Sequence, residues 1–290
     1  MSIVRDVAAV LVTVSAAASA MPAAAAESYD NCSRFVDALP AVLEQQGVWC
    51  LRGDLSTSAA GSGYVAIDIR ANNVTLECNG FKVGGLAGGV DTLAVGVGSS
   101  TSRLNTTIRG CSIRGFARGI SLEFNGGGHL VENNRLDNNR VVGILVSGGG
   151  STIRGNRVVT TGGSAIAAPS VGIAAGYDVD VIDNLVSGVA PKAGSGRDGI
   201  GILAQSNDLG TFSGNRVRAV DGDGAGVGIG IRVQGASHAI IAGNEITAGA
   251  AVSDQAVTCD SAQPSARDNT ISGYAAGLTG CSDDGGNIVK

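Results

Sequence analysis

Short stretches of alternating apolar and polar residues recur along most of the chain. In residues 152–158 (TIRGNRV), Ile153 and Val158 are apolar whereas Arg154 and Arg157 are polar. Alternation with a period of two is the pattern of a strand with one buried face, and the stretch lacks helical spacing. Near-copies of this unit occupy residues 107–113, 130–136, 212–217 and 241–246. The chain is therefore predicted to consist of repeated strands.

An asparagine marks the same place in successive copies. It returns every 22 to 31 residues, a period typical of solenoids, at Asn134, Asn156, Asn184, Asn215, Asn244 and Asn269. An asparagine tolerates the left-handed backbone of a tight turn and can hydrogen-bond to the same asparagine one coil away. We predict an internal asparagine ladder with a structural role.

A second apolar strand follows each marker and is opened by glycine, as in Gly143-Ile144 and Gly172-Ile173. Two or three strands per repeat form one coil, and like strands of stacked coils lie in parallel about 4.8 Å apart. No coil can bury its apolar face alone. The pattern predicts an all-β fold, a single-stranded parallel β-helix (solenoid) over residues 61–290, after a short N-terminal cap at 27–60. Apolar residues at near-helical spacing between positions 32 and 46 predict a capping helix.

Two further segments carry a family resemblance. Residues 74–81 (VTLECNGF) resemble the opening coil, and Gly115-Phe116 leading to Gly119-Ile120 resembles the second coil, of the right-handed parallel β-helix repeat proteins. These are relatives in architecture of pectate lyases and polygalacturonases. The resemblance runs from about Tyr64 to the C-terminus and implies a right-handed β-helix, but it specifies little chemistry.

The first 26 residues resemble a secretory signal peptide. Arg5 precedes an apolar and small-residue run from Val7 to Ala20, and cleavage is expected after Ala26. A membrane anchor would need about 20 strongly apolar residues, and this run is short and rich in Ala and Ser. Because no other segment could span a membrane, the mature chain is expected to be secreted or periplasmic, without a membrane span.

Six cysteines in an exported chain suggest three disulfides, for which sequence alone permits fifteen pairings. The repeat reduces the number of plausible pairings. Cys78 and Cys111 fall at nearly the same place in adjacent coils, and Cys259 and Cys281 lie in the last two full coils. That leaves Cys32 with Cys50 in the cap. The cysteine spacing and two remote histidines do not suit a metal site, so none is predicted.

Charge adds little about partners. The net charge of −5 does not favour nucleic acid, and a monomer is expected. One outward position reads Glu77, Arg109, Glu132 and Arg154 in four successive coils, which predicts a ladder of surface ion pairs. The alternative combines these residues with four further outward arginines as a groove for a polyanion, namely Arg135, Arg157, Arg216 and Arg218.

The middle coils have longer connections between the asparagine and the next Gly-Ile strand, all at one corner. Loops there should pile up into one wall, and they carry most of the candidate chemistry. A glycosidase needs two nearby carboxylates, which Asp198, Asp221 and Asp223 could supply. A lyase needs a base and a group that neutralises a uronate, for which Lys192, Arg197 and the strand residue Arg232 qualify.

Arg232 and Gln234 should face outward beside this wall as substrate-binding residues, because Ile231 and Val233 take the core positions. The aspartates of the wall could hold Ca²⁺, which is the one candidate cofactor. Asp178, Asp180 and Asp183 are also spaced like the ligands of a calcium-binding loop. The competing interpretation is that all these residues are ordinary turn formers.

Two hypotheses follow. The first is a carbohydrate-directed protein that binds a polysaccharide and acts as a lyase or glycoside hydrolase, which the long loops favour. The second is a non-catalytic envelope or adhesion scaffold, which the ten aromatic residues and the lack of a recognisable catalytic motif favour.

Overall fold

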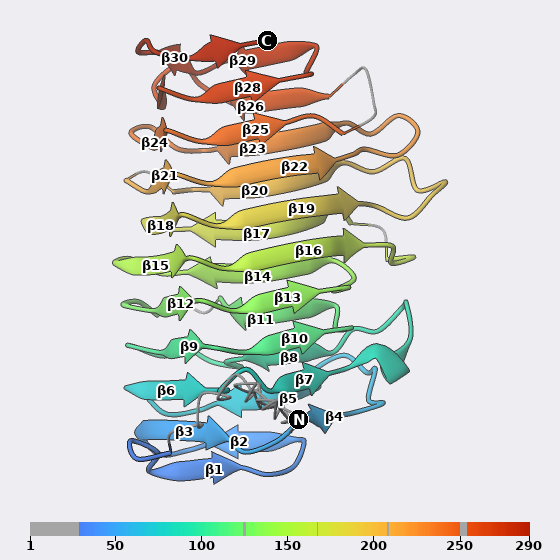
Figure 1. Cartoon of the computed structure of the whole chain (residues 1–290), viewed down its shortest axis with the longest axis vertical. Coiled ribbons are helices and arrows are strands. Elements are labelled where there is room, and N and C mark those ends of the chain that lie inside the picture. Colours follow the sequence, from blue (N-terminus) through green and yellow to red (C-terminus); the bar gives the residue numbers. More distant parts are fainter. Residues whose placement is uncertain (1–28, 124–125, 167, 208, 250–253) are drawn as a thin grey trace, which may run out of the picture.

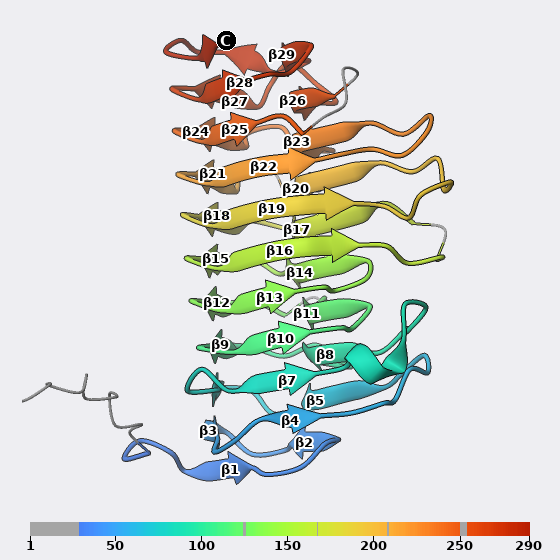
Figure 2. The same ribbon diagram turned by 45° about the vertical axis from the view of Figure 1, so that its right-hand side comes forward.

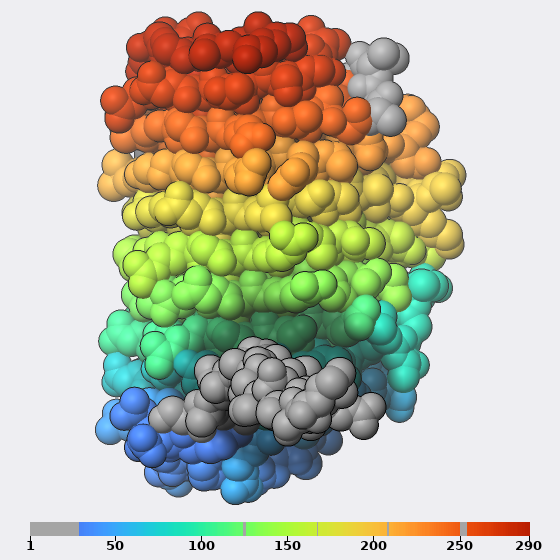
Figure 3. Space-filling view, viewed as in Figure 1, coloured from blue at the N-terminus to red at the C-terminus, as the bar shows by residue number. Residues whose placement is uncertain are grey.

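The computed structural model describes residues 29–123, 126–166, 168–207, 209–249 and 254–290. The expected signal peptide lies outside these residues. The strands form three parallel sheets, and the chain passes through them in the order A, C, B to complete one right-handed coil (Figures 1 and 2). The coils appear as bands stacked along the long axis in Figure 3. The predicted parallel β-helix is confirmed.

Sheet A contains eleven strands, with like strands of consecutive coils paired in register: β1 (Arg34–Val36), β3 (Gly47–Leu51), β6 (Val74–Glu77), β9 (Thr107–Arg109), β12 (Leu130–Glu132), β15 (Ser151–Arg154), β18 (Val179–Ile182), β21 (Thr211–Ser213), β24 (Ile240–Ala242), β27 (Ser265–Arg267) and β30 (Ser282–Asp283).

Sheet C follows sheet A within each coil and has ten strands: β4 (Leu55–Ser56), β7 (Lys82–Gly84), β10 (Ser112–Arg114), β13 (Arg135–Asp137), β16 (Arg157–Gly162), β19 (Leu185–Ala190), β22 (Arg216–Val220), β25 (Glu245–Thr247), β28 (Thr270–Ser272) and β31 (Ile288–Val289).

Sheet B closes the coil and also has ten strands: β2 (Ala41–Leu43), β5 (Val65–Ile69), β8 (Val95–Gly98), β11 (Arg118–Leu122), β14 (Val142–Ser147), β17 (Ser170–Gly176), β20 (Gly199–Gln205), β23 (Gly228–Gln234), β26 (Gln255–Cys259) and β29 (Ala276–Thr279).

The predicted capping helix is wrong. The segment forms β1 and β2, which join sheets A and B, and the described residues contain one short helix, the 3-10 turn η1 (Leu86–Gly88). Val36 on β1 and Leu43 on β2 both point into the core and are buried. Two short strands joined by a turn can therefore space their buried residues along the sequence as a helix would. Pro40 lies in that turn, where the loss of a backbone donor is tolerated.

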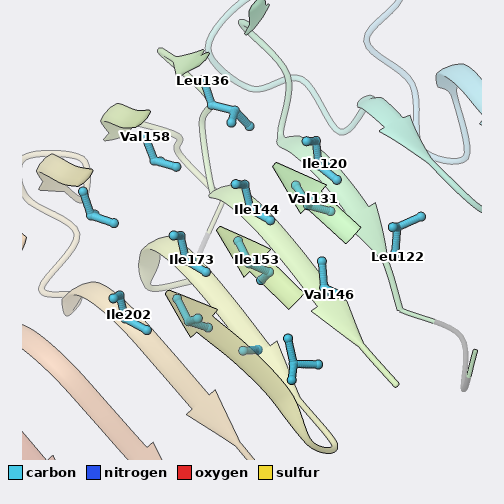
Figure 4. Packing of buried hydrophobic residues seen from close by; sticks show 14 of the residues in the cluster. Ile120, Leu122, Val131, Leu136, Ile144, Val146, Ile153, Val158, Ile173 and Ile202 are labelled. Atoms are coloured by element: carbon cyan, nitrogen blue, oxygen red, sulfur yellow. The ribbon is translucent and has the colours of Figure 1, made fainter. Parts of the chain in front are cut away.

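The core fills the space enclosed by the three sheets. Like residues stack from coil to coil, as with Ile144, Ile173 and Ile202 of sheet B, and all three are fully buried (Figure 4). They face Ile153 from sheet A and Val158 from sheet C. Each coil therefore buries its apolar face against the next, as solenoid stacking requires.

The asparagine ladder occupies the interior of the corner between sheets A and C. The side-chain nitrogen of each ladder asparagine donates to the side-chain oxygen of the next, at 2.9–3.1 Å from Asn134 to Asn287. The left-handed backbone, however, belongs to the residue before the asparagine, such as Asn133 (φ 54°) or Asp183 (φ 56°). The prediction that the asparagine itself adopts the left-handed conformation is therefore wrong. The asparagine points its side chain into the corner, and the residue before it has the positive φ.

The three predicted disulfides, Cys32–Cys50, Cys78–Cys111 and Cys259–Cys281, are formed. Cys111 stands at the ladder position of its coil, where its backbone N–H donates to Asn134 Oδ1 at 3.0 Å. The disulfide to Cys78 thus continues the contact between coils that asparagines make elsewhere.

Candidate functional site

The long loops lie at one corner, between the strands of sheet C and those of sheet B. The connections after β16, β19 and β22 project from the same flank of the stack (Figures 1 and 2). The wall expected from the loop lengths is therefore present. A further long connection, residues 85–94, follows β7 and was not predicted from the sequence.

A second apolar cluster lies on the outer face of sheet B, where the strands follow these loops. Val142, Val171, Ile200 and Ile229 stack there in register, each at most 9% exposed. The sequence showed these residues as part of the Gly-Ile strands without showing that they face away from the core. Val227 of the connection after β22 packs against this cluster, which gives that loop a packing role.

Two of the candidate aspartates hold backbone groups of the wall. Asp223 Oδ2 accepts hydrogen bonds from Gly196 N at 2.8 Å and from Ser195 Oγ at 3.4 Å. The hydrogen bond from Gly196 is the main cause that lowers the pKa of Asp223 below its usual value. Asp198 Oδ1 accepts from Val227 N at 3.0 Å. Both carboxylates therefore tie one loop to the next.

The third aspartate belongs to a different cluster. Asp221 lies close enough to Asp254 for the two charges to interact, and a Cβ atom on Gly249 would come within 1.9 Å of Asp221 Oδ1. Asp254 is fully buried; its Oδ1 accepts from Gly228 N at 2.7 Å, and its Oδ2 has no hydrogen-bond partner among the described residues. Burial is the main cause that raises the pKa of Asp254, and the charge of Asp221 adds to it.

The structure thus brings Asp198 close to Arg232, Asp223 to the loop containing Lys192 and Arg197, and Asp221 to Asp254. It does not give Asp198, Asp221 and Asp223 one shared environment. Lys192 and Arg197 line a cavity of about 230 Å³ together with Ala165 and Ile166 of the preceding loop.

Arg232 and Gln234 face outward, while Ile231 and Val233 are buried. Arg232 Nη1 lies 3.5 Å from Asp198 Oδ2. With its amide oxygen turned toward Arg232, the Gln234 side chain accepts from Nε and Nη2 at 2.9 Å. The guanidinium is therefore held between a carboxylate and an amide at the edge of the wall.

A hollow that the sequence did not predict lies lower on the outer face of sheet B. A cavity of about 440 Å³ is lined by apolar side chains including Leu93, Val95 and Ile166 and by the ion pair of Arg118 with Glu123. Glu123 Oε1 accepts from Arg118 Nη1 at 2.5 Å and from Ser121 Oγ at 2.6 Å. Alternation along β11 already placed Ser121 outward, which was the available signal.

A second hollow of about 260 Å³ adjoins the first at Glu123. Ser147, Gln205 and Ser206 contribute polar groups to it, and Tyr177, 57% exposed, stands at its rim. The two hollows share Glu123 in their linings on the outer side of sheet B, and together we call them the sheet B groove. A phenol ring presents both an apolar face and a polar end to a ligand.

The charges of sheet A form the predicted ion pairs, Arg109 with Glu77 at 2.5 Å and Arg154 with Glu132 at 2.7 Å. Arg135, Arg157, Arg216 and Arg218 lie on sheet C instead. Because the two sets occupy different faces, the single polyanion groove that would combine them is not formed.

Three other titratable residues also make structural contacts. His129 is buried and its Nδ1 accepts from Thr106 N at 3.3 Å, and burial lowers its pKa. Asp178 and Asp180 accept from Leu209 N and Thr211 N at 3.2 and 2.8 Å. Within the described residues, no three His, Cys, Asp or Glu side chains gather as a metal site. In the same residues, no helix has the length and apolar character to cross a membrane.

Solved structures share the fold at low sequence identity. The enzymatically active domain of tailspike protein 2 from bacteriophage CBA120 is 13% identical, with a TM-score of 0.54 over 86% of this chain and 42% of that one. A tailspike mutant of E. coli bacteriophage HK620 in complex with a pentasaccharide is 15% identical, with a TM-score of 0.50 over 84% of this chain and 60% of that one. The chain thus spans less than two thirds of either structure.

No curated protein matches the sequence. The family model described as a right handed beta helix region matches residues 57–194. The structure continues the same three parallel sheets on both sides of that match. The chain therefore has the right-handed parallel β-helix fold along its described length.

Proposed function

We propose that this is an exported, carbohydrate-directed protein that binds a polysaccharide along the sheet B groove. The groove is the observation that carries the proposal, because its two adjoining hollows combine apolar side chains with hydroxyl, amide and charged groups, a mixture that suits a chain of sugars. The HK620 tailspike mutant, which has a related fold, holds a pentasaccharide. Three disulfides support an oxidising destination outside the cytoplasm.

The proposal is for binding rather than for a particular reaction. Glycoside hydrolysis requires two carboxylates that face a sugar from opposite sides. Asp198 and Asp223 both accept hydrogen bonds from backbone N–H groups, and Asp254, the charge partner of Asp221, is fully buried. These contacts support a structural role for the candidates from the wall. Lys192 and Arg197 line a separate cavity that shares Ile166 with the sheet B groove, and an acidic sugar could meet them there.

The test is a panel of soluble polysaccharides measured with the full chain, with and without Ca²⁺. Binding is expected for at least one member, and Tyr177→Ala should weaken it about tenfold, equivalent to about 1.4 kcal/mol. Arg267→Ala on sheet A is the control and should leave the affinity unchanged. Binding that ignores groove substitutions, or no binding at all, would favour a scaffold without a carbohydrate ligand.

The same panel separates binding from catalysis. Release of reducing ends would indicate a hydrolase, and new absorbance from unsaturated uronates would indicate a lyase. Either activity would return Lys192, Arg197, Asp198, Asp221 and Asp223 to consideration as catalytic residues, to be tested one at a time. Tight binding without products is the outcome that this proposal expects.

A further inference from the structure

The outer face of sheet C carries a row of basic side chains on a protein whose net charge is −5. Lys82, Arg135, Arg157 and Arg216 occupy the same outward position of β7, β13, β16 and β22. Arg114 and Arg218 occupy the second outward position of β10 and β22. These strands lie one above another in Figure 1. The six residues define what we call the basic row.

Two arginines of the basic row are stacked directly on each other. Arg135 and Arg157 are register partners in neighbouring parallel strands, which lie about 4.8 Å apart. Like charges in facing positions of a sheet destabilise it. The fold does not require arginines to stack on each other. On sheet A, the outward residues of neighbouring strands alternate in charge, with Arg109 next to Glu77 and Arg154 next to Glu132.

The carboxylates beside the basic row neutralise only part of it. Lys82 pairs with Asp54, Arg216 with Glu245, and Arg114 with Asp137 at 2.9 Å, while Arg135 reaches the same Asp137 at 3.8 Å. Within the described residues, Arg157 and Arg218 have no carboxylate within 4 Å, and both are exposed. The face therefore presents unneutralised guanidinium groups to solvent.

A small hollow between arginines supplies a place for an anionic group. Arg216, Arg218, Glu245 and Thr247 enclose about 90 Å³ on the surface of β22 and β25. From there to Arg157 is two coils, or about 10 Å along the stack. A guanidinium binds a carboxylate or sulfate through two parallel hydrogen bonds, which an ammonium cannot do.

We propose that the basic row binds a linear acidic polysaccharide, with Arg157 and Arg218 as its main contacts. The cations recur along the stacking axis, so a slender chain with regularly spaced carboxylates can meet several of them at once. A broad anionic surface would also meet the acidic remainder of this protein and be repelled. The inference concerns a second surface and does not depend on the sheet B groove.

The test uses polygalacturonate, with its fully methyl-esterified form as the uncharged match. Binding of polygalacturonate is expected at low ionic strength, should weaken with added salt, and should be absent for the ester. Arg157→Gln and Arg218→Gln should each lower the affinity about tenfold, the effect of losing one charge-assisted hydrogen bond. Arg157→Lys, which keeps the positive charge, should lower the affinity less than Arg157→Gln does.

Arg267→Gln on β27 removes the same charge from exposed sheet A and serves as the matched control. If it lowers the affinity as much as Arg157→Gln does, the attraction is one of overall charge and the proposal is overturned. Stronger binding to vesicles of anionic phospholipid than to polygalacturonate would also overturn it. Thermal melts establish that every variant is folded.

Variants of the sheet B groove and of the basic row show which of the two surfaces binds the acidic chain. If Tyr177→Ala abolishes polygalacturonate binding and the arginine variants do not affect it, the acidic chain lies in the sheet B groove and the basic row is not its site. If the arginine variants lose binding while Tyr177→Ala does not, the basic row acts independently of the groove.

Discussion

At the scale of single residues, each ladder asparagine links three coils. Asn215 Nδ2 donates to Val181 O at 2.8 Å and to Asn244 Oδ1 at 3.0 Å, and its own Oδ1 accepts from Asn184. Asn215→Ala should therefore lower the free energy of unfolding by roughly 1–3 kcal/mol, because neighbouring buried groups lose their partners. Urea denaturation measures this. Ser187→Ala on the surface of β19 is the control, and an equal cost for both would contradict a ladder role.

The buried carboxyl of Asp254 should make stability depend on pH. Its pKa is raised in the folded state, so the folded protein binds this proton more tightly than the unfolded chain does. Its contribution is then most favourable below the unfolded pKa of about 3.9 and is lost as the pH rises through the folded pKa. Asp254→Asn removes the charge and keeps an oxygen for Gly228 N.

The expected result is that Asp254→Asn melts at a higher temperature than the natural protein near neutral pH, and that the difference shrinks toward pH 4. The same thermal melts with Asp260→Asn, an exposed carboxylate, should show no such trend. A constant difference at every pH would mean that Asp254 stays ionised in the folded state.

The direction of a strand side chain could be predicted from the sequence, because it follows from the alternation within one strand. Contacts between residues of neighbouring coils could not be predicted. Arg232 faces outward because Ile231 and Val233 are buried, and this needs only the period of one strand. The roles of Asp198 and Asp223 depend on which backbone N–H groups of the next loops come within reach, and no local pattern records that.

At the scale of elements, the wall is a set of loops that hold one another. Asp223 fixes the loop at residues 191–198 through Gly196 N and Ser195 Oγ. Asp223→Ala should loosen this loop, and trypsin should then cut after Lys192 several-fold faster, because proteolysis requires local opening. Asp260→Ala is the control. If cleavage is unchanged while ligand turnover falls, Asp223 has a chemical role instead.

Element prediction failed where two patterns coincide. Residues 32–46 space their apolar residues like a helix, yet two short strands on either side of Pro40 bury Val36 and Leu43 equally well. Where the pattern repeats, as in the strands that place Ile144, Ile173 and Ile202, the ambiguity disappears, because one interpretation has to satisfy every copy. The first coil does not carry the repeat, so no second copy of its pattern is present to distinguish a helix from two strands.

At the scale of the whole molecule, the three sheets present different surfaces from one repeat. Sheet A pairs its charges, sheet B is hollowed and bordered by loops, and sheet C leaves arginines without carboxylates. The core positions are alike in all three, so the fold places no constraint on the outward residues. A rigid stack of this kind can carry two independent binding surfaces.

Because coils contact only their neighbours, stability should be divided along the stack. Ile173 is fully buried between Ile144 and Ile202, and Ile173→Ala should cost about 2–5 kcal/mol through the cavity it leaves. Hydrogen exchange should accelerate most in β14, β17 and β20 and less with each coil beyond them. Ile271→Ala in β28 should instead loosen the C-terminal coils alone, since its outer neighbour Val289 is already 55% exposed. Equal acceleration in every coil for both variants would mean that the stack unfolds as one cooperative unit.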